Sequence, residues 1–200
     1  SSISAAAISM FAQSKNNYRQ NDKMAQMQEN ARYVLNLLGD ELSRTGFYGR
    51  HLSDLDLAKI KLYAEVPGGP TNDCPTGWTY DPRQPLGYYV EANDVLATLA
   101  GCMSSDDYLP QTEVLQLKYT VGPISPGSLN TGTVYMSGNP IENNMFIEGA
   151  ANPPNAPVTG TVGVNVEVWE YLARIYYIGF SDDEPNLPAL RRKNLEAGDP

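Results

Sequence analysis

The chain has few of the side chains on which most enzymes depend. Its 200 residues include one histidine, His51, and two cysteines, Cys74 and Cys102. A Ser-His-Asp triad therefore has a single candidate base, and His51 stands in a polar stretch with no marked partner. The sequence also contains no Gly-rich phosphate loop, no His/Cys metal-ligand spacing and no nucleophile elbow. We therefore expect no catalytic residue, no cofactor and no enzyme activity.

Basic side chains are scarce as well. Lys and Arg number 14 against 23 Asp and Glu, and the formal net charge is -9 at pH 7. Proteins that bind nucleic acid through its phosphates concentrate positive charge, so we expect no direct nucleic-acid partner. Charged residues make up only 18% of the chain, which contains 17 glycines, 15 prolines and 13 tyrosines. This mixture favours a head that is rich in β-strands and turns.

Three consecutive acidic residues are the candidate ligands for a metal ion: Asp182, Asp183 and Glu184. Their carboxylate oxygens suit Ca²⁺, but the run lacks the Asp-x-Asp-x-Asp-Gly spacing and Pro185 follows it directly. We interpret the run as a solvated acidic turn and expect no metal site. Glycoside hydrolysis uses a pair of carboxylates that need not be close in sequence. No pattern here identifies such a pair, and the sequence does not exclude one.

No apolar run is long enough to span a bilayer, which requires about 20 residues. The uncharged run at the beginning of the sequence, Ser1 to Ala12, has only about half that length. It starts without a charged flank, and we interpret it as the second part of a longer apolar segment. The alternative is a soluble amphipathic helix with an Ala/Ser-rich start.

The first 46 residues predict one long helix. Four apolar residues of its first part form what we call the filament-core segment: Ile3, Ala7, Met10 and Phe11. Farther along, apolar residues recur in steps of three or four and form the packing stripe: Met24, Met27, Ala31, Val34, Leu38 and Leu42. The helix should stop near Gly46, where glycine can adopt the left-handed cap. We expect the stripe to pack on the head and the filament-core segment to lie elsewhere, in a membrane or a bundle of helices.

The chain therefore divides into a helix at 1–46 and a β-rich head at 47–200. Alternation and aromatic or β-branched content predict strands at Tyr88–Val90, Val114–Val121, Thr133–Met136, Asn144–Glu148, Thr161–Trp169 and Tyr171–Phe180. Turns are expected at Gly122-Pro123 and at Ser137-Gly138-Asn139-Pro140. The fold class is α+β, with a long N-terminal helix packed on an antiparallel sheet that has long loops.

The two cysteines allow two interpretations. In the cytosol Cys74 and Cys102 would be free thiols, whereas in an oxidising compartment they would pair, which is worth about 3–4 kcal/mol for a loop of this length. The apolar end of the helix favours export and therefore the disulfide. Trp78, Tyr80, Tyr88 and Tyr89 lie between them. We expect these aromatic residues to pack beneath the loop, and the alternative is an exposed surface that binds glycan or another subunit.

The end of the helix resembles a known family. The stretch from Gln28 to Gly49 reads QENARYVLNLLGDELSRTGFYG and is similar to the helix end of the PilW-type minor pilins of type IV pili. Residues 11–28 resemble the same family more loosely. Later segments are similar in the same order, namely Thr112–Tyr119, Ala173–Ile178 and Leu190–Arg192. The amino-terminal Gly-Phe-x-x-x-Glu signature of the family is absent, and the family usually continues past Leu195, so we expect a chain truncated at both ends.

The resemblance implies a function in filament assembly. It implies a type IV pilin-like fold and a minor subunit of a Gram-negative pilus that helps to initiate the filament, and so contributes to twitching motility, adhesion or DNA uptake. The expected partners are the other minor pilins, the major pilin and the inner membrane, which would hold the helix before assembly while the head lies in the periplasm. The alternatives are a pseudopilin of a type II secretion system and a helix-anchored carbohydrate-binding or hydrolytic domain.

Overall fold

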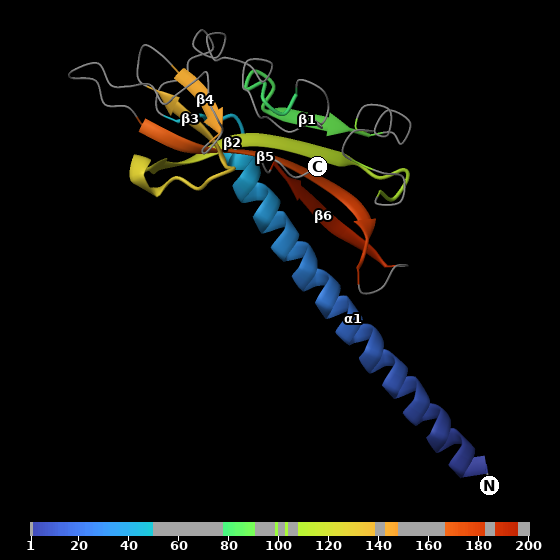
Figure 1. Cartoon of the computed structure of the whole chain (residues 1–200). Coiled ribbons are helices and arrows are strands. Elements are labelled where there is room, and N and C mark those ends of the chain that lie inside the picture. Colours follow the sequence, from blue (N-terminus) through green and yellow to red (C-terminus); the bar gives the residue numbers. More distant parts are fainter. Residues whose placement is uncertain are drawn as a thin grey trace. The chain divides into compact units, whose positions relative to one another are not determined.

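The computed structural model describes residues 2–49, 78–90, 99, 103, 108–138, 143–147, 167–182 and 187–195, with helix side chains from residue 10 onward. It confirms the α+β class, because one long helix precedes an antiparallel sheet (Figure 1). The elements are α1 (Ser2–Arg44), β1 (Leu86–Tyr89), β2 (Val114–Ile124), η2 (Pro126–Ser128), β3 (Val134–Gly138), β4 (Asn143–Ile147), β5 (Glu167–Phe180) and β6 (Pro188–Asn194).

Helix α1 is a compact unit by itself, separate from the unit that begins at Arg44. Its 43 residues correspond to a length of about 65 Å. The helix ends two residues before the predicted boundary, and Gly46 follows with a φ of 82°, as expected for a left-handed cap. The single interior glycine, Gly39, leaves the helix unbroken, since an isolated glycine costs only about 1 kcal/mol.

The packing stripe of the helix is unevenly exposed. Met24, Met27 and Leu42 expose 60%, 71% and 44% of their surface. Ala31 is also exposed, whereas Val34 and Leu38 are half-buried. Helix and head are described as two units, and the packing of the stripe on the sheet stays a prediction.

The six strands form one antiparallel sheet (Figure 1). Five of them follow the order β1-β2-β5-β3-β4, and β6 pairs with β5 outside this order. Strand β5 lies at the centre, where it pairs with β2 along one side. On its other side it pairs with β3 near its beginning and with β6 near its end. Because β5 contacts three strands, it organises the sheet.

One strand prediction and two turn predictions need correction. Ser137 and Gly138, which are predicted to begin a turn, belong to strand β3 and pair with β4. The structure has one continuous strand, β5, where we predicted separate strands up to Trp169 and from Tyr171. The ladder continues through Glu170, whose backbone is flanked by Val121 and Tyr135 on the neighbouring strands. The predicted turn at Gly122-Pro123 is also wrong, because these residues form an irregularity inside β2 before Ile124 pairs with Val168.

The core lies on both faces of the sheet. One face carries two buried clusters, which comprise Tyr48, Trp78, Tyr80, Val134, Met136, Met145, Ile147, Tyr171 and Ala173, and Leu99, Met103, Tyr108, Val114, Ile175 and Tyr177. The opposite face carries a smaller cluster of Tyr135, Phe146 and Val168. Strand β2 is buried on both faces over most of its length, so its polar side chains at 116, 118 and 120 are enclosed as well.

Candidate functional site

The chain that leaves the helix is fastened to strand β2. The amide of Gly46 donates to the carbonyl oxygen of Lys118, at 2.9 Å, and the amide of Thr120 donates to the carbonyl oxygen of Phe47, at 2.7 Å. The Thr120 hydroxyl donates to the same Phe47 oxygen, at 3.0 Å. These bonds lie next to the beginning of β1, since the amide of Lys118 donates to the carbonyl oxygen of Pro85, the residue before β1. Gly46 and Phe47 thus continue the edge of the sheet next to β2.

Aromatic side chains fix the same segment to β5. Phe47 meets Trp169 edge-on, with ring centroids 5.4 Å apart, and Tyr48 stacks on Tyr171 with centroids 6.2 Å apart. Such pairs contribute about 0.5–1.5 kcal/mol beyond the area they bury. Burial, with the negative charge of Asp81 as a second cause, raises the pKa of the Tyr48 hydroxyl above its ordinary value. The segment after the helix is therefore held by backbone bonds and by two ring contacts.

We expect three glycine-to-alanine substitutions to separate the roles of this segment. Gly49 has a φ of 86°, and a Cβ there would lie 3.0 Å from Trp169 Nε1, so Gly49→Ala should lower the free energy of unfolding by more than about 1 kcal/mol. Gly46→Ala, at a φ of 82° with 3.4 Å of clearance to Pro85, should cost about 1 kcal/mol. Gly39→Ala, inside the helix, should raise the helix content slightly. Urea denaturation and circular dichroism measure these effects, and equal losses at Gly39 and Gly49 would contradict the assignment.

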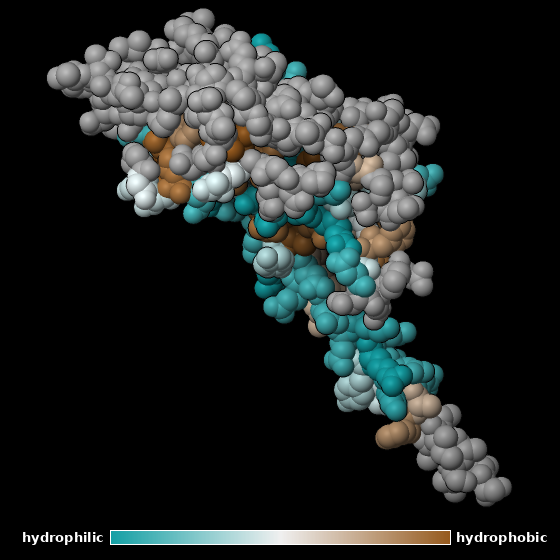
Figure 2. All heavy atoms as spheres, viewed as in Figure 1, coloured by the Kyte–Doolittle hydropathy of each residue, from teal (hydrophilic) through white to brown (hydrophobic). Residues whose placement is uncertain are grey.

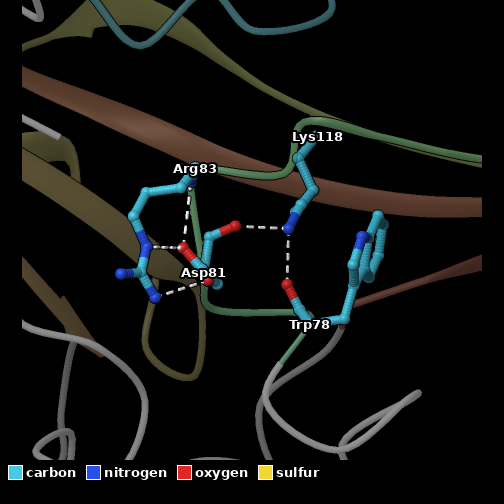
Figure 3. A network of polar contacts seen from close by, with 4 residues as sticks. All are labelled: Trp78, Asp81, Arg83 and Lys118. Atoms are coloured by element: carbon cyan, nitrogen blue, oxygen red, sulfur yellow. Dashed lines mark hydrogen bonds and ion pairs between the residues drawn. The ribbon is translucent and has the colours of Figure 1, made fainter. Parts of the chain in front are cut away.

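Lys118 is the most unusual residue of this region, because it carries a charge and is 0% exposed. Its Nζ donates to the carbonyl oxygens of Trp78 and Asp81, and it lies 3.9 Å from the centroid of the Trp78 ring (Figure 3). A buried ammonium is tolerated only when it is hydrogen-bonded. The two carbonyls and the indole face provide that compensation, so Lys118 clamps the turn at 78–81 onto β2.

Asp81 and Arg83 complete the turn. The Arg83 guanidinium donates from Nε to one Asp81 carboxylate oxygen and from Nη2 to the other, each at 2.8 Å (Figure 3). The hydrogen bond from Arg83 is the main reason that the pKa of Asp81 lies below its ordinary value, and the charge of Lys118 contributes in the same direction. The Tyr171 hydroxyl donates to the carbonyl oxygen of Thr79, at 2.6 Å, which adds a bond from β5.

The lowered pKa of Asp81 predicts a pH dependence of stability. A carboxyl group with a lower pKa in the folded state stabilises the fold above its unfolded pKa, near the ordinary value of 3.8, and loses that contribution as pH falls through the folded pKa. Arg83→Gln should therefore be less stable than the wild type at pH 5–7, and the difference should shrink below about pH 3.8. Urea titrations across this range test the prediction. Arg192→Gln, which leaves the pair intact, should parallel the wild type, and a parallel profile for Arg83→Gln would overturn it.

The contacts of Lys118 hold separate segments of the chain together. The Lys118 ammonium donates hydrogen bonds to the backbone carbonyls of Trp78 and Asp81. The Asp81 carboxylate is engaged by Arg83 on both of its oxygens. Through its carbonyl oxygen and its side chain, Lys118 joins three segments: the exit from the helix, strand β2 and the turn at 78–81. We refer to this set of contacts as the Lys118 clamp.

The structure describes only some of the candidate site residues that the sequence indicates. His51, Cys74 and Cys102 lie outside the described residues, as do Asp183 and Glu184. Within the filament-core segment Met10 and Phe11 expose 73% and 75% of their surface, and the side chains of Ile3 and Ala7 lie outside the description. The predicted disulfide therefore stays a prediction.

Asp182 forms an ion pair with β6. Its two carboxylate oxygens accept hydrogen bonds from the Arg191 guanidinium at 2.6 and 2.8 Å, and these bonds lower the pKa of Asp182. Arg191 also donates from Nε to the carbonyl oxygen of Phe180, at 2.8 Å, so the pair holds the connection between β5 and β6. Within the described ranges no three His, Cys, Asp or Glu residues gather into a metal-binding group.

The aromatic residues between the cysteines behave in two ways. Trp78 and Tyr80 are buried in the core, as expected of residues packed beneath a loop. Tyr88 is 54% exposed on β1, where the hydrogen bond that its hydroxyl donates to the Glu113 carboxylate raises the pKa of Tyr88. The packing prediction is therefore confirmed for Trp78 and Tyr80 and is wrong for Tyr88, because Tyr88 points away from the core on the outer strand.

The contacts of the Lys118 clamp are not predicted by any pattern in the sequence. Alternation correctly places Gln116, Lys118 and Thr120 on one side of β2, and such a polar row gives no sign of burial. The side is buried because the turn at 78–81 and the residues after the helix cover it. No local signal in the sequence connects Lys118 with Trp78, which lies 40 positions away.

Comparisons with known proteins found no match to this chain among protein-family models, curated proteins or solved structures. In the part of the chain that the structure describes, no helix is both long enough and apolar enough to cross a membrane. In the described residues, the chain is thus characterised by its own architecture: a long N-terminal helix, an antiparallel sheet, and the segment after the helix that is bonded to β2.

Proposed function

We propose that this protein is a minor subunit of a type IV pilus and that it helps to start or assemble the filament. The observation that carries the proposal is the continuous 43-residue helix, followed at once by a segment that is hydrogen-bonded into an antiparallel sheet. Filament subunits of this class need a helix that extends beyond what one head can bury. A helix of about 65 Å exceeds the requirement of a domain core of this size.

The distribution of apolar residues supports an assembly role. Met10 and Phe11 lie near the beginning of the helix and are largely exposed, and Tyr18 is 70% exposed. Each would gain about 1.5–3 kcal/mol on full burial. Neighbouring helices inside a filament would bury such side chains, and the inner membrane would hold the apolar end beforehand. The partners of the proposal are therefore the major pilin and the other minor pilins.

We expect the Lys118 clamp to strengthen the connection through which force passes from the helix to the head. A subunit that is held in a filament by its helix transmits force to its head through the residues between them. Those residues are bonded to β2 and stacked on β5 by Phe47 and Tyr48, instead of forming a free linker. This construction suits a filament subunit better than an enzyme tethered to a membrane, for which a flexible connection suffices.

Deletion of the gene tests the proposal. The expected result is fewer surface filaments with an unchanged amount of major pilin, together with reduced twitching, adhesion or DNA uptake. Complementation with the wild-type gene should restore filament number. Filaments of normal number in the deletion strain would remove the assembly role. A loss of protein secretion with normal pili would assign the chain to a type II secretion system instead, and polysaccharide hydrolysis by the purified protein would favour the enzymatic alternative.

A further inference from the structure

The helix carries a row of basic side chains directly after the apolar filament-core segment. Lys15, Arg19 and Lys23 follow one another in steps of four residues. Each step advances about 6 Å along the axis and turns about 40°, so the three lie in one slightly slanting row of about 12 Å. All three side chains are exposed. We call this row the basic stripe.

The charge of the basic stripe is not neutralised within the structure. Asp22 is the only acidic residue between positions 10 and 23, whereas the chain as a whole has a formal net charge of -9. No ion pair among the described residues engages Lys15, Arg19 or Lys23. An acidic protein thus presents its free positive charge beside its most apolar helical segment. This combination suits a partner that is both apolar and anionic.

Aromatic side chains flank the basic stripe. Phe11 lies four residues before Lys15 and is 75% exposed, and Tyr18 lies three residues after Lys15 and is 70% exposed. On the visible part of the described helix, hydrophobic surface gives way to hydrophilic surface within a short distance (Figure 2). Aromatic rings and Lys or Arg side chains with long apolar stems are the residues that settle at a lipid–water interface.

We propose that the basic stripe binds the phosphate groups of an anionic lipid bilayer, at the border where the apolar segment enters the membrane before assembly. The proposal rests on the proposed function for its cellular setting, whereas its physical argument depends only on the helix. Each positively charged side chain of the stripe would contribute about 1 kcal/mol to binding at an anionic membrane surface. Contact with an acidic helix of another subunit would need the charges alone. The exposed Phe11 and Tyr18 beside them therefore favour lipid.

Vesicle binding of the purified 200-residue protein tests the proposal. The protein should co-sediment with phosphatidylcholine vesicles that contain phosphatidylglycerol much more than with phosphatidylcholine alone. Lys15→Gln/Arg19→Gln should weaken binding to the anionic vesicles about 30-fold, from about five-fold per charge. Salt near 1 M should produce a similar loss in the wild type, because the screening length falls from about 10 Å to about 3 Å. Lys15→Arg/Arg19→Lys should bind as the wild type does.

A matched variant controls for net charge. Arg32→Gln/Arg192→Gln removes the same charge from exposed side chains that form no ion pair in the structure, and it should keep its vesicle binding. Equal losses in the two double variants, or equal wild-type binding to neutral and anionic vesicles, would overturn the proposal. Unchanged vesicle binding by Lys15→Gln/Arg19→Gln, with reduced cross-linking to another pilin, would assign the stripe to a protein partner. If the protein binds anionic vesicles through the basic stripe but its deletion leaves pili unchanged, the lipid-binding proposal stands and the proposed role in pilus assembly is wrong.

Discussion

Lys118→Met should lower the free energy of unfolding by about 2–4 kcal/mol. Methionine keeps most of the volume of the side chain, so the loss isolates the polar contacts of the ammonium. Without the ammonium, the Trp78 carbonyl keeps only the bond from the Asp81 amide, at 3.1 Å, and the Asp81 carbonyl keeps only the longer bond from the Gln84 amide, at 3.4 Å. A hydrogen bond from a charged donor is worth about 1.5–3 kcal/mol, and the contact with the Trp78 ring is lost as well.

Urea denaturation followed by tryptophan fluorescence measures the Lys118→Met effect. Both tryptophans of the chain, Trp78 and Trp169, belong to the head, so the signal reports unfolding of the head. Arg192→Met removes a charge from an exposed position of β6 and should change stability by less than about 0.5 kcal/mol. A Lys118→Met protein as stable as the wild type would mean that the clamp is replaceable by simple packing.

Tyr171→Ala should cost about 3–5 kcal/mol, the usual loss for a large aromatic residue removed from a core. Tyr171 is 2% exposed, stacks on Tyr48, and donates from its hydroxyl to the carbonyl oxygen of Thr79. Tyr171→Phe keeps the stacking and removes the hydrogen bond, so it should cost about 1–3 kcal/mol. The two variants together separate ring packing from the polar bond.

The exposed Tyr88→Ala serves as the control for Tyr171 and should change stability by about 0.5 kcal/mol or less. A double-mutant cycle with Tyr48→Ala should give a coupling energy of about 0.5–1.5 kcal/mol to Tyr171. Additive losses at Tyr48 and Tyr171 would show that the stacked pair has no energetic connection. The segment after the helix would then depend on its backbone bonds and on the Phe47–Trp169 contact.

The elements that the sequence predicts well are those with a strong local pattern. The helix is marked by apolar residues in steps of three or four and by Gly46 as its stop, and its end differs by only two residues. Strand β2 is marked by alternation from Val114 onward, and it is longer than predicted because the ladder passes the irregularity at Gly122-Pro123. Local periodicity therefore suffices where neighbouring residues decide the structure.

The remaining features depend on contacts between distant residues. No strand is predicted at Pro188–Asn194, where three consecutive basic residues resemble a solvated loop, yet β6 pairs with β5, and a strand at the margin of a sheet tolerates charge. The burial of Lys118 likewise follows from the turn that covers it and not from its neighbours in sequence. Both β6 and the burial of Lys118 depend on which distant segments lie next to each other. A periodic pattern in the sequence does not contain that information.

The most direct test of the filament assignment is to measure the protein in sheared surface filaments by quantitative mass spectrometry. A minor subunit should be present in the filament fraction at a small, constant ratio to the major pilin. A strain that makes the protein but lacks the major pilin should yield none in the sheared fraction. Detection of the full cellular amount in the envelope, with none in purified filaments, would contradict the account.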